Sequence, residues 1–201
     1  MRTTQKLGVA RFNIRQITVV GILTAITVIL GQFGIGFFYI PGWPAKITIM
    51  HIPVIIGAVL EGPLVGAMVG LLFGIFSIIQ NVMVPTPLSF AFMNPLVSVL
   101  PRILIGITAY YSYNLIRIRS EAVRIGIAAA IGTATNTVGV LGMIYLLYAE
   151  PYVKAIGKDV TKAGQAIAAI GATNGIGEIV AAVVIVTAVV TSIKQLMKRS
   201  R

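Results

Sequence analysis

The chain has 201 residues, of which 57% are hydrophobic and only 10% are charged, and its mean hydropathy is +0.96. A soluble domain carries about 25% charged residues, so a water-soluble globule is excluded. The high aliphatic content excludes a disordered chain, and the absence of cysteine excludes a disulfide scaffold and thiolate metal sites. The composition therefore predicts an all-α integral membrane protein.

Six apolar runs follow one another along the sequence, in what we expect to be a single domain over residues 1–201. They cover residues 17–40, 51–60, 64–79, 96–116, 123–147 and 166–193. A bilayer core of about 30 Å needs around 20 apolar residues in a helix. We therefore expect six transmembrane helices, the second of them short. The first run is too long for the apolar region of a secretory signal, so we expect it to be retained.

Three segments between the runs are expected to be loops. Residues 39–44 (YIPGWP) contain two prolines and a glycine, which cannot continue a helix, and residues 45–50 are predicted to be extended. Residues 82–95 hold three prolines, and residues 150–162 are polar.

Sixteen Lys and Arg residues against five Asp and Glu residues give a net charge of +11. The basic residues flank the apolar runs, where they meet lipid headgroups, so no nucleic-acid partner is expected. With the N-terminus inside, the cytoplasmic segments hold eleven basic residues and the outer segments four. The positive-inside rule then predicts that both termini are cytoplasmic, with basic tails at residues 1–16 and 194–201.

Small residues recur at helical spacing in two runs. Gly62, Gly66, Gly70 and Gly74 form a strip without side chains, either for packing inside the chain or for docking a partner. Gly21 and Ala25 repeat the pattern on the first run.

Polar residues inside the apolar runs are costly in a membrane, so they are candidates for function. Arg102 lies about 10 Å into the fourth run, Asn136 is midway along the fifth, and Asn174 and Glu178 share a face of the sixth. They form either a polar pocket for a ligand or an internal Arg102–Glu178 ion pair.

Trp43, Lys46 and His51 gather beside the proline-broken loop at the expected outer end. His51 is not expected to bind a metal, because no second ligand lies near it in the sequence, and Trp43 is either a ligand contact or an interfacial anchor. The sequence contains no phosphate-binding loop, no H-E-x-x-H and no G-x-S-x-G. Neither catalysis nor direct use of ATP is expected, so any uphill transport takes its energy from another protein.

Several short stretches carry a family resemblance that covers nearly the whole chain. Residues 51–63 (HIPVIIGAVLEGP), followed by the glycines at 66, 70 and 74, resemble the substrate-binding S components of energy-coupling factor (ECF) vitamin transporters. Residues 94–96 (NPL), Pro101-Arg102 and residues 174–178 (NGIGE) are similar to the branch that contains the pantothenate binders.

The resemblance implies a bacterial cell-membrane subunit that binds a vitamin near the outer face, under a gating loop after the first helix. It implies a membrane coupling subunit and two cytosolic ATPases as partners. It also implies that this subunit topples in the bilayer to release the vitamin inward, and that it has no cofactor of its own. The family's Ala-x-x-x-Ala coupling motif falls on Gly21 and Ala25. The expected substrate-binding residues are Trp43, Lys46, His51, Asn94, Arg102, Asn136, Asn174 and Glu178.

The cationic pair Arg102 and Lys46 suits an anion such as pantothenate, because a guanidinium pairs bidentately with a carboxylate. A pyridoxine-type or other small B vitamin remains an alternative, since amide and aromatic side chains also suit a heterocycle. A small intramembrane enzyme using Arg102, Glu178 and His51, or a structural or channel-forming protein, are hypotheses from other classes.

Overall fold

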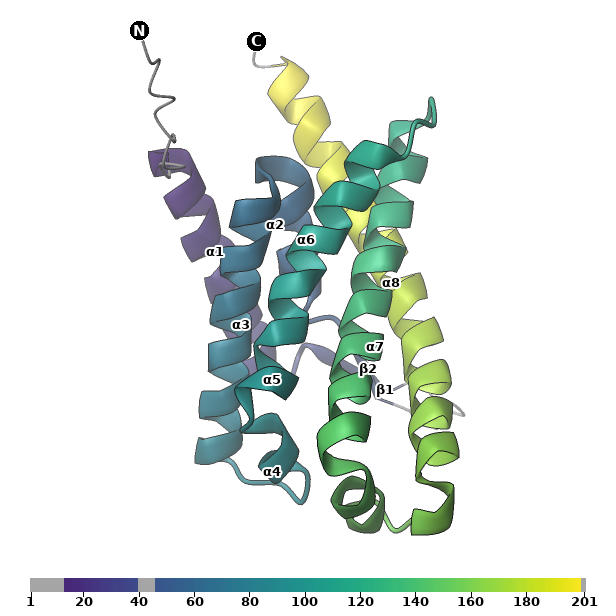
Figure 1. Ribbon diagram of the computed structural model, residues 1–201. Coiled ribbons are helices and arrows are strands. Elements are labelled where there is room, and N and C mark those ends of the chain that lie inside the picture. Colours follow the sequence, from purple (N-terminus) through teal and green to yellow (C-terminus); the bar gives the residue numbers. More distant parts are fainter. Residues whose placement is uncertain (1–12, 40–45, 200–201) are drawn as a thin grey trace, which may run out of the picture.

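The computed structural model describes residues 13–39 and 46–199, which form a bundle of helices with one small hairpin (Figure 1). In chain order the elements are α1 Ile14–Gln32, β1 Phe37–Tyr39, β2 Lys46–Thr48, α2 Ile52–Glu61, α3 Pro63–Met83, α4 Ser89–Phe92, α5 Pro95–Ser98, α6 Leu100–Leu115, α7 Glu121–Ala155, the 3-10 turn η1 Val160–Lys162, and α8 Ala163–Arg199.

Within residues 13–39 and 46–199, five helical stretches are long and apolar enough to cross a membrane, which makes this a multi-pass membrane protein. They are α1, α3, α5 with α6, α7, and η1 with α8. The second predicted span, α2, is the remaining one; it has ten residues and extends about 15 Å, half of a bilayer core. The start of α1 and the end of α8 lie at the same end of the bundle, which we call the basic end (Figure 1).

The sequence predicted that the first apolar run stays helical to residue 40, but the helix ends earlier. The helix α1 ends at Gln32, and Gly34 then adopts a positive φ of 69° that favours glycine. Phe37 begins β1, which pairs antiparallel with β2 in the register Phe37↔Thr48. Apolarity reports the surroundings of a segment and not its backbone conformation, so it could not reveal this boundary. Of residues 45–50, which were predicted to be extended, residues 46–48 form the strand β2.

The predicted loops at 82–95 and 150–162 are partly helical. The first contains the end of α3, the short helix α4 and the first residue of α5. In the second, α7 continues to Ala155 across a kink at Tyr148, close to Pro151. The segment predicted as a basic C-terminal tail is helical as far as Arg199, and α1 already begins at Ile14 within the predicted N-terminal tail.

The glycine strip of α3 packs inside the chain, against α6. A Cβ added at Gly66, Gly70 or Gly74 would collide with main-chain atoms, among them those of Arg102 and Gly106. The packing interpretation of this strip is therefore confirmed. Gly62 does not belong to the strip, because its φ of 104° forms the corner between α2 and α3.

The short helix α2 lies in the centre of the bundle. Every residue from Ile52 to Val59 is buried, and α2 contacts α1, α3, α6, α7 and α8. A ten-residue helix can be accommodated here because other helices, and not lipid, surround it. His51, at its start, is thereby buried in the protein. The hairpin lies about half-way along the bundle (Figure 1).

Candidate functional site

Four predicted site residues are buried inside the bundle, and each comes from a different element. His51 precedes α2 and is 1% exposed, Arg102 on α6 is 7% exposed, Asn136 on α7 is 8% exposed and Glu178 on α8 is 5% exposed. The first turn of α2 and three long helices thus place an imidazole, a guanidinium, an amide and a carboxylate in the interior. We call these four residues the polar site.

Glu178 connects the hairpin to the long helices. Its Oε1 accepts a hydrogen bond from the main-chain N–H of Thr48, with N and O 3.2 Å apart, and its Oε2 accepts one from the hydroxyl of Thr137 at 3.1 Å. Both carboxylate oxygens are therefore engaged. Because Thr48 is the last residue of β2, this carboxylate joins the hairpin to α8.

His51 is held by Thr133 on α7, with Nε2 2.9 Å from the threonine Oγ1, and its Nδ1 has no hydrogen-bond partner. Thr48, Thr133 and Thr137 were not predicted as site residues. Threonine occurs often in apolar runs, so its presence alone gives no indication. The spacing of Thr133 and Thr137, one helical turn apart on the run that holds Asn136, was the available indication.

Arg102 is only partly satisfied. One guanidinium nitrogen donates to the carbonyl of Val97, the group lies 5.5 Å from the centre of the Phe73 ring, and Nε has no hydrogen-bond partner. The predicted alternative, a direct Arg102–Glu178 ion pair, does not form. The ion pairs among the described residues are Arg15–Glu61 and Lys194–Glu121, and the charges of Arg102 and Glu178 interact at a longer range.

Three buried polar atoms of the polar site are thus left without partners: His51 Nδ1, Arg102 Nε and Asn136 Oδ1. Such atoms are rare in folded proteins and costly in a membrane interior. Together they offer a cation and further hydrogen-bonding groups. This arrangement suits a small anionic molecule that also carries polar groups.

The remaining predicted site residues are placed differently. The amide of Asn94 donates to the hydroxyl of Tyr148 at 3.0 Å, and its oxygen accepts from the N–H of Leu96, so Asn94 joins the start of α5 to the kink of α7. Asn174 is half-buried, one turn before Glu178. Trp43 and the side chain of Lys46 lie outside the described residues, although the backbone of Lys46 begins β2.

The predicted coupling pair lies on the outside of the bundle. Gly21 and Ala25 are exposed on α1, and a Cβ added at Gly21 would meet nothing within 4 Å. Ile22, Ile26 and Ile29 are also between 41% and 56% exposed. This face of α1 therefore does not pack against the part of the chain that the structure describes.

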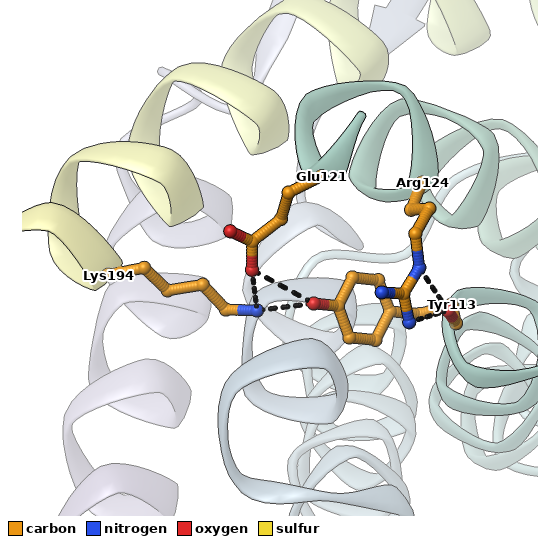
Figure 2. Close-up of polar contacts among 4 residues, drawn as sticks. All are labelled: Tyr113, Glu121, Arg124 and Lys194. Carbon is orange, nitrogen blue, oxygen red and sulfur yellow. Dashed lines mark hydrogen bonds and ion pairs between the residues drawn. The ribbon is translucent and has the colours of Figure 1, made fainter. Parts of the chain in front are cut away.

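A second polar cluster joins α6, α7 and α8 at the basic end (Figure 2). Lys194 donates to the Tyr113 hydroxyl and lies 2.8 Å from Glu121 Oε1, while Arg124 donates twice to the main-chain carbonyl of Tyr113. Both cations lie 4.4 Å from the centre of the Tyr113 ring. Two of the basic residues expected only to flank spans therefore hold helix ends together.

Comparison with known proteins agrees with this architecture. The family described as ECF transporter, substrate-specific component, matches residues 15–190. The chain belongs to this family. It is also 32% identical to the pantothenic acid transporter PanT of Lactococcus lactis subsp. cremoris (strain MG1363), over 92% of this chain and 96% of that protein. The predicted family is confirmed. Membership of this family makes the chain a transporter component and not an enzyme.

Proposed function

We propose that this S component binds pantothenate at the polar site. Pantothenate carries a carboxylate, an amide and two hydroxyl groups. The observation that carries the proposal is the buried Arg102, whose Nε lacks a partner in a part of the protein where an unpaired cation is costly. A carboxylate is the ligand that a guanidinium pairs with most strongly. The resemblance over the whole chain to a protein named as a pantothenic acid transporter supports the same substrate.

Each member of the polar site has a proposed role. Arg102 pairs with the carboxylate, while His51 Nδ1 and Asn136 bind the amide or hydroxyl groups, because these are the atoms without partners. Glu178 keeps its two hydrogen bonds to Thr48 and Thr137 and accepts a further one from a substrate hydroxyl. Asn174, one turn before Glu178, and Lys46 and Trp43, in and before β2, complete the contact set.

The loop between α1 and α2, residues 39–50, acts as the gate. Its strand β2 is joined to α8 through the Thr48–Glu178 hydrogen bond. Glu178 therefore both holds the loop and, in this proposal, contacts the substrate. Opening of the loop must break this bond or move it with α8. Substrate therefore stabilises the closed hairpin.

Uptake requires partners, since the sequence has no nucleotide-binding motif. We propose the arrangement implied by the family: a membrane coupling subunit and two cytosolic ATPases, with the basic end and both termini in the cytoplasm. The eleven-to-four distribution of Lys and Arg supports this orientation. The exposed face of α1 around Gly21 and Ala25 is the proposed contact with the coupling subunit, because small residues let another helix approach closely.

Calorimetry of the purified chain against a panel of B vitamins tests the substrate. Pantothenate should bind most tightly, and pyridoxine, thiamine, riboflavin and biotin should bind at least tenfold more weakly, about 1.4 kcal/mol. Tight binding of a pyridoxine-type vitamin with no binding of pantothenate would contradict the proposed substrate while leaving the family assignment intact. Turnover of any vitamin by the isolated chain would instead support the enzyme hypothesis.

A further inference from the structure

A groove of about 720 Å³ lies between α7 and α8 towards the basic end, away from the polar site. Small and β-branched side chains make up its walls. They are Ala122, Val123, Gly126, Ile127, Ala130, Val183, Val184, Thr187 and Ala188. Because Val123 is 46% exposed and Val184 is 63% exposed, the groove opens on the outer surface of the bundle. In a membrane this surface meets lipid.

The groove exists because α7 carries small residues where it faces α8. Ala122, Gly126 and Ala130 follow one another at intervals of one turn. A Cβ added at Gly126 would lie 3.5 Å from Thr187 Oγ1 and 3.5 Å from a methyl group of Val183, which is ordinary contact. At Gly126 the two helices are therefore close together, and the apolar lining around this position suits an apolar occupant.

One polar atom lies within this apolar lining. The hydroxyl of Thr187 is buried without a hydrogen-bond partner, and so is that of Thr191, one turn closer to the basic end. Gly126, opposite Thr187, is five residues from the start of α7, or about 7.5 Å below it. Both hydroxyl oxygens are closed off from the surroundings, so the groove offers its occupant mainly apolar contacts.

Cations lie beyond the hydroxyls. Arg119 is exposed and precedes Ala122 by three residues, and Lys198 on α8 is exposed and close enough for its charge to act on Glu121. Glu121 itself is paired with Lys194 at 2.8 Å, so its negative charge is compensated locally. The end of the groove is therefore positively charged overall and includes the amino-terminal end of α7, which favours an anion.

An apolar channel with cations at its end matches the acyl chain and the phosphate of a glycerophospholipid. We propose that this groove binds an anionic phospholipid, with one acyl chain between α7 and α8 and the phosphate at Arg119 and Lys198. A partner helix would satisfy the apolar lining but would leave the cations without a matching anionic group.

Native mass spectrometry of the purified full chain tests the proposal, with phosphatidylglycerol and phosphatidylcholine of the same acyl composition as probes. Phosphatidylglycerol should bind more tightly. Arg119→Gln should weaken its binding about fivefold and leave phosphatidylcholine unchanged. The matched control is Lys158→Gln, an exposed basic residue at the opposite end of the bundle, which should have no effect. Equal binding of the two lipids, or equal effects of the two variants, would overturn the proposal.

Filling the groove is the second arm of the experiment. Ala188→Leu places a larger side chain in the groove and should lower phosphatidylglycerol occupancy by at least about fivefold. Ala169→Leu is its control, because Ala169 is exposed on the same helix and lies outside the groove lining. Ala130→Leu repeats the test from α7 if Ala188→Leu proves unstable in thermal unfolding. If both groove variants retain normal lipid binding, the groove is not the lipid site. If the same variants then lose binding of a partner protein, the groove binds a helix of that partner instead.

Discussion

Gly70 lies directly against the main chain of Arg102, so that a Cβ on Gly70 would overlap the Arg102 carbonyl oxygen. The absence of a side chain at one position of α3 thus fixes the backbone of the residue that we propose binds the substrate carboxylate. The same close approach recurs one turn away, where Gly66 faces Gly106. The glycine strip is therefore part of what positions the polar site.

Gly70→Ala should impair both folding and binding. The added methyl group meets main-chain atoms that cannot rotate away, so we expect a loss of about 1–3 kcal/mol in the free energy of unfolding and a measurable fall in vitamin affinity. Gly142→Ala on α7 is the control, because a Cβ there meets nothing within 4 Å. Thermal unfolding in detergent and calorimetry measure the two effects. Normal stability and affinity for Gly70→Ala would show that α6 tolerates displacement.

Substrate should protect the hairpin from hydrogen exchange. The amide of Thr48 donates to Glu178, so a ligand that immobilises this carboxylate slows exchange at Thr48 and its neighbours in β2. We expect protection to rise with pantothenate, and to be lower without ligand in Glu178→Ala than in the unchanged protein. Hydrogen–deuterium exchange with mass spectrometry gives the measurement. Identical protection with and without the vitamin would argue against a gate.

Gly21→Leu and Ala25→Leu should separate binding from uptake. Both positions are exposed on α1, so a larger side chain there leaves the polar site intact but keeps a partner helix at a distance. Vitamin binding by the isolated chain should persist, while ATP-driven uptake by the full complex should fail. Intact uptake would mean that α1 does not dock there. Loss of binding in the isolated chain would mean that the face has an internal role.

The Tyr113 cluster should contribute to stability and not to substrate affinity. Tyr113→Phe removes the hydroxyl that contacts Lys194 and Glu121 but keeps the ring beneath the two cations, and should cost about 1 kcal/mol. Tyr113→Leu also removes the cation–π contacts and should cost about 1 kcal/mol more. Unfolding measurements on the two variants test this order. A change in vitamin affinity without a change in stability would contradict it.

Much of the architecture could be predicted because hydropathy reports which segments avoid water. The long apolar runs, the short second helix, the packing role of Gly66, Gly70 and Gly74, and the burial of Arg102 and Glu178 all follow from composition and spacing. These properties depend on local sequence and on the high cost of charge in lipid.

The unpredicted features depend on contacts between distant segments. Residues 33–39 are apolar and were expected to be helical, yet they lead into a hairpin because their partners lie in β2. Thr48 and Thr137 become site residues only because the fold brings them to Glu178, 130 and 41 positions away along the chain. Nor does the sequence alone show whether Arg102 pairs with Glu178 directly, since that depends on how α6 and α8 are placed.

The central claim is that Arg102 binds the carboxylate of pantothenate. Calorimetry with pantothenate and with its neutral alcohol analogue, in the unchanged protein, in Arg102→Ala and in the control Arg117→Ala, tests it most directly. The unchanged protein and the control should prefer pantothenate at least tenfold, about 1.4 kcal/mol, and Arg102→Ala should lose that preference because its affinity for pantothenate alone falls. Equal loss of affinity for both compounds, or a preference that persists in Arg102→Ala, would contradict the claim.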